Sequence, residues 1–253
     1  MQHSNVQITT EDGTCPAHVL RPDGDAKWPS VLMFMDGIGM RSAIVDMAAR
    51  LASAGYYVLL PDLFYRVEYD PTVGTKLFTE RGSDAVKDWM SRVMGSANAA
   101  NVMRDTHAFL AHLDSAPQAR SDSVGITGYC MGGRLTLNAA GEFGDRFKAA
   151  AAYHAGNVAT DSPDSPHRRA SDMRAKVYVG GAKEDPGFDA AQQARLDSAL
   201  TEGGVDHTIE IYDARHGWVP SDTPVHDAVA TERHWDTLLS LFGTTLGDAR
   251  GTT

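Results

Sequence analysis

Cysteine is scarce in this sequence, and its scarcity excludes two classes of protein. The 253 residues include Cys15 and Cys130 and no other cysteine. Disulfide-rich scaffolds and cysteine-rich metal sites both need more thiols than this. Cys15 falls in a turn between two early strands, and we assign it no functional role.

Long hydrophobic runs are also missing. No stretch is long and apolar enough to cross a bilayer. The opening residues 1–5 lack the pattern that begins a secretory signal peptide. We therefore expect a cytoplasmic protein that does not associate with a membrane.

Positive charge is the third shortage. The chain has 23 Lys and Arg against 33 Asp and Glu, which gives a formal net charge of −10. This balance disfavours nucleic acid and anionic membrane surfaces as partners. A phosphate-cradling glycine loop, a histidine pair with metal-ligand spacing and a nucleotide-binding fingerprint are also lacking. We therefore expect a small-molecule partner, no metal and no cofactor, and either a monomer or a homodimer.

What the chain does contain is an alternation of short apolar runs with longer amphipathic segments. This alternation is typical of strands and crossover helices that pack on a parallel sheet. The sequence predicts an α/β protein with a mostly parallel, twisted central sheet of about eight strands and helices on both faces. The expected strands are 6–9, 17–20, 31–35, 57–60, 123–127, 148–153, 176–179 and 208–212. The expected helices are 43–54, 98–113, 134–140, 190–200 and 225–242.

The domain organisation follows from length and composition. Hydrophobic residues make up 42% of the chain, enough for a sizeable core, and 253 residues fit one large domain or two small ones. We expect a single domain over 1–243. The small, polar residues of 244–253 predict a flexible tail.

Two stretches interrupt the alternation. The first, 62–95, mixes aromatic and basic residues. Long connections of this kind are often lids or binding loops, so we expect a lid-like insertion that forms one wall of a substrate pocket, with Tyr65 and Trp89 as contacts. The second, 156–174, is rich in aspartate, proline and arginine and is expected to be a mobile surface loop.

The most informative motif is Gly-Tyr-Cys-Met-Gly-Gly at 128–133. It follows the apolar run 123–127 and precedes the helical segment 134–140, which predicts a strand, a sharp turn and a helix with a thiol at the apex. This pattern fits the G-x-S-x-G nucleophile elbow with cysteine in place of serine. The N-terminus of the helix favours the thiolate form. Alternatively, Cys130 is a small buried hydrophobe, as isolated cysteines commonly are.

An acid and a histidine follow the elbow in the order found in α/β-hydrolases. Asp185, with Glu184 beside it, comes after the apolar run 177–181, and His216 comes after 209–212. Open α/β sheets carry their functional loops at such strand ends. The order nucleophile, acid, histidine predicts a catalytic triad. A surface acid and a solvated loop histidine are the alternative interpretations.

Three blocks of the sequence, 128–133, 55–64 and 216–218, resemble the dienelactone hydrolase family. The resemblance extends over nearly the whole chain, and the block around the elbow is the most specific. It implies an α/β-hydrolase fold. It also implies hydrolysis of a carboxylic ester, lactone or enol-lactone bond through a Cys-His-Asp triad and a thioacyl-enzyme intermediate.

The resemblance assigns the reactive residues one by one. Cys130 matches the family nucleophile, and His216 matches its histidine. Asp185 matches the family acid because it follows its strand in the same way, while Glu184 stays open as the alternative. In these roles the histidine moves the proton and the acid fixes the histidine tautomer.

The loop after the third predicted strand completes the expected machinery. The backbone N–H groups of Met131 and Gly37 are expected to hold the oxyanion. The family resemblance implies a glutamate directly after this strand that assists ionisation of the cysteine, and Asp36 stands there instead. Its shorter side chain either makes a weaker version of that contact or caps nearby N–H groups.

Substrate specificity departs from the family pattern. The resemblance implies arginines that hold a substrate carboxylate, one of them shortly after the catalytic histidine, but residues 217–220 contain no arginine. Arg81 is the candidate replacement, with a solvated surface cation as the alternative. Trp218 and His154 are further candidate substrate contacts, although a structural hydrogen bond also explains His154. A less charged ester or lactone is therefore favoured over dienelactone.

Two other functions stay open. The same triad could act on a thioester or another activated acyl compound. A catalytically silent α/β-hydrolase scaffold that binds a small ligand is the alternative from a different class, and Asp36 is its only hint.

Overall fold

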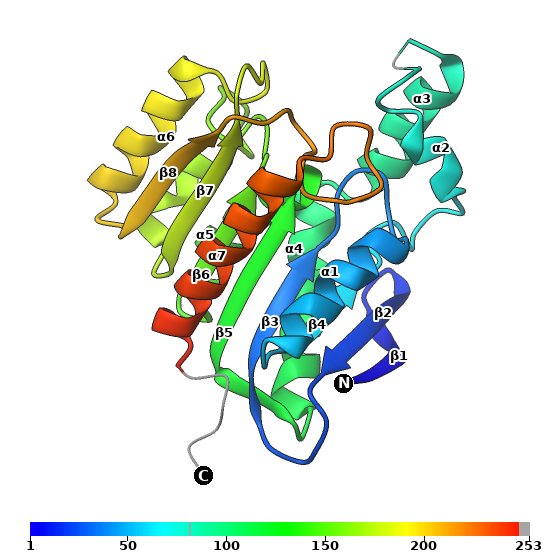
Figure 1. Ribbon diagram of the computed structural model, residues 1–253, viewed down its shortest axis with the longest axis vertical. Helices are drawn as coiled ribbons and strands as arrows, with labels where there is room; N and C mark the ends of the chain where they lie inside the picture. The colour runs from blue at the N-terminus through cyan, green and yellow to red at the C-terminus, as the bar shows by residue number, and fades with distance from the viewer. Residues whose placement is uncertain (81, 248–253) are drawn as a thin grey trace.

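A computed structural model of the chain describes residues 1–80 and 82–247. Within these residues the strands form one sheet in the order β1-β2-β4-β3-β5-β6-β7-β8 (Figure 1). The strands are β1 (Gln2–Thr10), β2 (Gly13–Arg21), β3 (Trp28–Phe34), β4 (Tyr57–Pro61), β5 (Ala119–Tyr129), β6 (Phe147–Tyr153), β7 (Lys176–Ala182) and β8 (His207–Tyr212).

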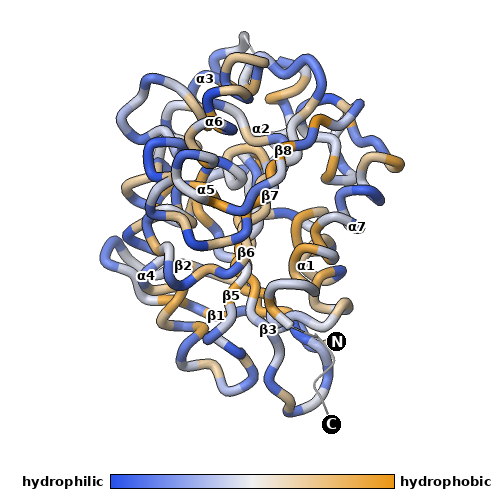
Figure 2. Tube along the Cα trace, turned by 90° about the vertical axis from the view of Figure 1, so that its left-hand side faces the viewer, coloured by the Kyte–Doolittle hydropathy of each residue, from blue (hydrophilic) through white to orange (hydrophobic). Residues whose placement is uncertain are grey.

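Helices cover both faces of the sheet. Figure 2 shows α1 and α7 on one side of the strands and α4, α5 and α6 on the other. The helices are α1 (Ser42–Ser53), α2 (Pro71–Thr75), α3 (Asp84–Asp88), the π-helix η1 (Trp89–Met94), α4 (Ala99–Ser115), α5 (Met131–Glu142), the 3-10 helix η2 (Pro166–Asp172), α6 (Ala190–Glu202) and α7 (Ala228–Thr245). None of the helices in the described ranges is long and apolar enough to traverse a bilayer.

The strand directions agree with the predicted fold class. β2 pairs antiparallel with β1 and β4, whereas β3 is parallel to β4 and β5, and the pairs onward to β8 are parallel. Every residue of β3 is buried, as expected for a strand covered on both faces. The mostly parallel sheet with helices on both faces, the α/β-hydrolase architecture, is thereby confirmed.

Parallel strands bring their carboxyl ends to one edge of the sheet, where loops from distant parts of the chain meet. In Figure 1 the arrowheads of β3 and β5 point toward the end of the molecule that carries α2 and α3. The loop between β8 and α7, drawn in orange, passes over the same end. This edge is where the candidate site lies.

The predicted lid-like insertion at 62–95 contains α2, α3 and η1 rather than irregular loop alone. Phe64, Tyr69 and Trp89 form a cluster in which the rings meet edge to face, with centroids 5.4 to 6.0 Å apart. Edge-to-face packing of this kind adds stabilisation beyond the area that the rings bury. The insertion is therefore tied together by aromatic side chains.

The stretch 156–174, expected to be a mobile surface loop, is packed against the domain. It includes η2, in which Pro166 and Ala170 are buried. The side chain of Asn138 in α5 donates a hydrogen bond to the backbone oxygen of Asp164 at 2.9 Å. Its surface position was predicted correctly, but buried apolar residues and a backbone anchor hold it in place.

The predicted tail begins too early. Helix α7 continues to Thr245, and the side chain of Leu246 is 2% exposed, because it packs on the core next to Gly125. Residues 244–247 are therefore part of the domain. Residues 248–253, which the prediction also assigned to the tail, lie outside the described residues.

Candidate active site

The elbow after β5 places Cys130 in a strained backbone conformation, with φ 54° and ψ −114°. Two glycines permit the tight turn from strand to helix. A Cβ on Gly132 would lie 2.3 Å from the backbone oxygen of Met35, and one on Gly128 would lie 2.3 Å from the oxygen of Gly132. Only glycine fits at these positions, so α5 can start directly behind the thiol.

His216 lies between the thiol and a carboxylate. Its Nε2 is 3.1 Å from Cys130 Sγ, and its Nδ1 is 2.6 Å from Asp185 Oδ2. The carboxyl group of Asp185 is itself fixed, because its Oδ1 accepts the Gly187 N–H at 2.8 Å. Glu184, the alternative acid, is exposed, and the acid in contact with His216 is Asp185.

The electrostatics of this group favour a charged imidazole. Burial disfavours the imidazolium, but negative charge on Cys130 and the hydrogen bond with Asp185 raise the pKa of His216 to about 10. Chemically, the arrangement can supply a nucleophile together with a proton donor.

In the loop at 36–40, which follows β3, two backbone N–H groups donate to Asp36. The Ile38 N–H donates to Asp36 Oδ1 at 2.9 Å, and the Gly39 N–H donates to the Asp36 backbone oxygen at 3.3 Å. Among the described residues, no hydrogen bond takes up the N–H of Gly37. Met131 is the first residue of α5, where helix N–H groups lack intrahelical acceptors.

The insertion packs directly on this loop. The indole Nε1 of Trp89 donates a hydrogen bond to the backbone oxygen of Gly37 at 2.9 Å. A Cβ on Gly37 would meet the methyl carbon of Met94 at 2.8 Å, so the glycine allows the close approach. Trp89 is 2% exposed and therefore supports the loop from behind.

Comparison with known proteins shows the family of the chain. Residues 15–246 match the model of the Dienelactone hydrolase family, which is most of the chain. The chain belongs to this family. Membership of the dienelactone hydrolase family makes the protein a hydrolase of the class that acts on carboxylic esters and lactones.

Relatives of this chain match it over most of its length. A candidate carboxymethylenebutenolidase from Methylorubrum extorquens is 29% identical over 244 residues, covering 94% of this chain and 79% of the relative. A protein of the same description from Synechocystis is 23% identical, covering 95% and 96%. The crystal structure of a candidate dienelactone hydrolase from Klebsiella pneumoniae superimposes with a TM-score of 0.83 at 23% identity, covering 96% and 98%.

The carboxylate of Asp36 faces an arginine. Its two oxygens accept hydrogen bonds from Arg41 at 2.7 and 2.8 Å, and the residue is 4% exposed. None of the hydrogen bonds found in the described residues joins Asp36 to Cys130. Asp36 was expected either to assist ionisation of the cysteine or to cap nearby N–H groups. Its contacts are those of a capping residue.

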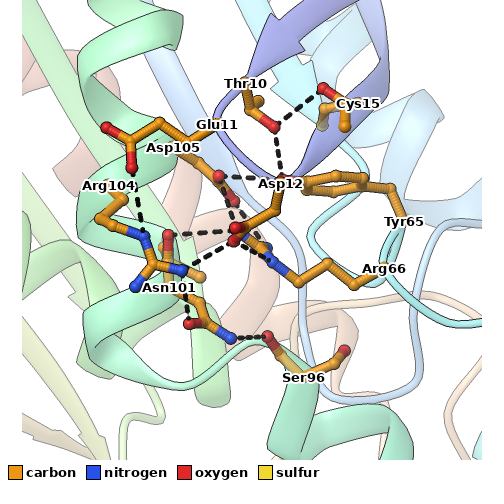
Figure 3. Close-up of polar contacts among 12 residues, drawn as sticks. Thr10, Glu11, Asp12, Cys15, Tyr65, Arg66, Ser96, Asn101, Arg104 and Asp105 are labelled. Carbon is orange, nitrogen blue, oxygen red and sulfur yellow. Dashed lines mark hydrogen bonds and ion pairs between the residues drawn. The ribbon is translucent and has the colours of Figure 1, made fainter.

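Tyr65 does not join the site. Its hydroxyl is 2.6 Å from Thr10 Oγ1 in β1 and donates to Asp105 Oδ1 in α4 at 2.9 Å (Figure 3). Strands β2, β4 and β3 separate β1 from β5, so the tyrosine hydroxyl lies near the β1 edge of the sheet, away from the elbow. The prediction of Tyr65 as a substrate contact is wrong, because a buried polar network holds its hydroxyl. Arg81 lies outside the described residues.

His154 and Trp218 lie beneath His216. The ring of His154 is centred 5.3 Å from the His216 ring and 4.9 Å from the Trp218 ring, and both residues are fully buried. The backbone N–H of His154 donates to the backbone oxygen of Gly180 at 2.7 Å, while neither ring nitrogen has a hydrogen-bond partner among the described residues. Burial lowers the pKa of His154 well below its ordinary value, so the ring stays neutral.

Sequence reasoning missed the residues that join the loops of the site. Arg41 and Asp222 have no motif that marks them, and 181 positions separate them. Phe78 was seen only as one aromatic residue of the insertion, yet a Cβ on Gly217 would lie 2.9 Å from its ring. The only signal in the sequence was position, since Asp222 follows His216 closely and Arg41 follows Asp36 closely.

Proposed function

We propose that the protein hydrolyses carboxylic ester or lactone bonds by nucleophilic catalysis, with Cys130, His216 and Asp185 as a triad. The observation that carries the proposal is the unbroken contact from thiol to imidazole to carboxylate, at 3.1 and 2.6 Å. Such a chain of hydrogen bonds activates a nucleophile and orients its base. The raised pKa of His216 supports a charged imidazole at neutral pH.

In the first half of the reaction, the Cys130 thiolate attacks the carbonyl carbon, and the carbonyl oxygen takes up negative charge. When the oxyanion collapses, the bond to the leaving oxygen breaks. The proton on His216 Nε2 passes to the departing alkoxide. The product is a thioacyl-enzyme, and in a lactone the released alcohol stays attached to the acyl group.

In the second half, water replaces the alcohol. Neutral His216 takes a proton from the water, which attacks the thioester carbon, and the sulfur leaves as thiolate. The acid product departs, and His216 is again protonated beside the thiolate. Asp185 holds the proton on Nδ1 throughout, which keeps Nε2 directed at the sulfur.

The oxyanion is held, in this proposal, by the N–H groups of Gly37 and Met131. The Gly37 amide has no other acceptor in the described structure. The Met131 amide belongs to the first turn of α5, where the helix dipole also favours negative charge. Loss of one such donor costs about a hundred-fold to a thousand-fold in rate.

The substrate is proposed to be a less charged ester or lactone. Phe78 adjoins the residue after His216, and Met94 adjoins Gly37, so apolar side chains from the insertion border the reacting groups. Trp218 and the neighbouring Val219 are buried and uncharged. Arg81 as an anion contact stays a prediction.

The decisive experiment is turnover of p-nitrophenyl acetate with and without prior treatment with iodoacetamide, followed by mass spectrometry of the adduct. We expect one label on Cys130 and loss of turnover. Cys15 should stay unlabelled, because it is fully buried and burial raises the pKa of its thiol. Cys15→Ala is the matched control and should keep both labelling and turnover.

The Cys130→Ser variant tests the nucleophile directly. We expect it to fold normally and to lose at least about a hundred-fold of the ester hydrolysis, because a hydroxyl needs a base that is tuned to it. Full activity in this variant would contradict the role of Cys130. An unreactive Cys130 without turnover in the unmodified protein would favour the ligand-binding scaffold.

A further inference from the structure

The guanidinium of Arg41 uses every N–H group that it has. An arginine side chain carries five N–H donors. Nη1 donates to Asp36 Oδ1 at 2.7 Å and to the Gly39 backbone oxygen at 3.0 Å. Nη2 donates to Asp36 Oδ2 at 2.8 Å and to Asp222 Oδ1 at 3.0 Å. Nε donates to Asp222 Oδ2 at 2.6 Å.

This arginine therefore binds two carboxylates, each through two hydrogen bonds. Forked pairs of this kind fix orientation as well as distance. The side chain of Arg41 is 9% exposed, that of Asp36 6% and that of Asp222 37%. Burial opposes the charge on the guanidinium, but both carboxylates raise the pKa of Arg41, so it remains a cation.

The two carboxylates belong to the two loops that border the thiol. Asp36 begins the loop that contains the free Gly37 amide. Asp222 lies in the loop between His216 and α7. Arg41 is the N-cap residue of α1, and this helix packs against β2 and β4. One side chain thus joins the donor loop to the histidine loop.

Peptide geometry explains how a side chain can aim a backbone donor. The peptide between Asp36 and Gly37 is planar and trans, so its C=O and N–H point in opposite directions. The C=O of Asp36 accepts the Gly39 N–H, while Arg41 holds both the Asp36 carboxylate and the Gly39 C=O. The direction of the Gly37 N–H is fixed by these contacts.

We infer that Arg41 is a positioning residue for the oxyanion site: it holds the Gly37 amide in register with Cys130 and His216 through Asp36 on one side and Asp222 on the other. The inference rests on the proposed function. Arg41 does not touch the substrate or the reacting atoms. Its effect falls on the step that creates negative charge on the carbonyl oxygen, and ionisation of the thiol does not depend on it.

Asp222→Asn tests the bridge while it keeps the buried pair of Arg41 with Asp36. The amide can accept one hydrogen bond, but its NH₂ group faces a guanidinium N–H and loses the second. We expect acylation by p-nitrophenyl acetate to slow about tenfold. This is less than the roughly hundred-fold loss of rate that a misplacement of about 1 Å in a reacting group can cause. Alkylation of Cys130 by iodoacetamide forms no oxyanion, so its rate and pH profile should not change.

Asp114→Asn is the matched control. Asp114 accepts a hydrogen bond from Arg146 at 2.7 Å, and its side chain is 46% exposed, close to the 37% of Asp222. The substitution is the same and the partner is again an arginine, but Asp114 lies in α4 and Arg146 directly before β6, away from the site. Both acylation and alkylation should keep their normal rates.

Three results separate the possibilities. Slower acylation with normal alkylation supports the inference, whereas an equal loss in both reactions, or none, overturns it. Absence of turnover in the unmodified protein overturns the proposed function instead. Amide hydrogen exchange tests the bridge even without turnover. Asp222→Asn should speed exchange at residues 36–40, and Asp114→Asn should not. Unchanged exchange at residues 36–40 in Asp222→Asn would contradict the bridge.

Discussion

The charge on His216 depends on both of its hydrogen-bond partners. Burial works against the imidazolium, yet negative charge on Cys130 and the carboxylate of Asp185 raise the pKa of His216 to about 10. The imidazolium is the form that can protonate a departing alkoxide.

Acylation by an ethyl ester should therefore fall as the pH rises through about 10. A raised pKa means that the imidazolium is present below this pH and is lost above it, so the acid for the leaving group disappears on the alkaline side. Pre-steady-state acylation rates measured at a series of pH values below and above that pKa report the change.

A p-nitrophenyl ester of the same acid is the control for this pH dependence. Its leaving group is a stable anion and needs no proton, so its acylation rate should not fall over the same range. A parallel fall for both esters would show that another group, or loss of the fold, controls the rate.

The sequence alone identified the candidate catalytic residues that stand in a recognisable local pattern. Cys130 stands in a short glycine-rich motif, and His216 and Asp185 follow strands in a familiar order. Their mutual contacts could be expected because strand ends meet at one edge of a sheet. Arg41 and Asp222 could not be found this way, since their contact depends on loop conformations that no local pattern encodes.

At the scale of elements, the elbow depends on how closely α5 approaches β3 and β5. Gly132 faces the backbone oxygens of Met35 and Phe34, at 2.3 and 2.6 Å from the position of a Cβ. Backbone atoms cannot move aside as the end of a flexible side chain can. The start of α5 is therefore packed against the sheet with no room for a methyl group.

Gly132→Ala should lower the free energy of unfolding by about 1–3 kcal/mol, the usual cost of forcing a methyl group into a packed interior. Urea denaturation measures the change. Gly243→Ala is the matched control, because Gly243 also lies in a helix but has no atom within 4 Å of the added carbon. There the better helix propensity of alanine should stabilise by about 1 kcal/mol. Equal effects at both positions would contradict the packing argument.

The elements themselves were predicted well where periodicity or capping marks them. The helix expected at 98–113 begins at Ala99, because the Asn98 side chain accepts the Asn101 N–H as an N-cap. The short helices α2, α3 and η1 were missed. Five or six residues cannot show a helical repeat, and aromatic packing and caps stabilise these turns instead.

At the scale of the whole molecule, a buried network joins three distant segments (Figure 3). Arg66, at the base of the insertion, donates to both oxygens of Asp105 in α4, at 2.8 and 2.7 Å. It also donates to Asp12 at the tip of the β1-β2 hairpin, at 2.9 and 2.7 Å. Asp105 is 1% exposed, and Arg66 is the ion-pair partner of its carboxyl group.

Arg66→Leu should destabilise the fold by about 3–5 kcal/mol, because it leaves a buried carboxylate without its partner. Arg195→Leu is the control: its ion pair with Asp161 has side chains 49% and 94% exposed. Exposed pairs contribute about 1 kcal/mol or less. Thermal and urea unfolding of both variants measure the difference, and a small effect at Arg66 would mean that the hairpin and the insertion are anchored elsewhere.

The contact between Arg41 and Asp222 spans 181 positions of the chain, which has a consequence for protein synthesis. Asp36, Arg41 and Cys130 leave the ribosome well before Asp185, His216 and Asp222 do. A nascent chain at that stage carries a thiol without its imidazole and a donor loop without its second anchor. The sulfur therefore meets its imidazole only after β8 and the loop that follows it have been synthesised.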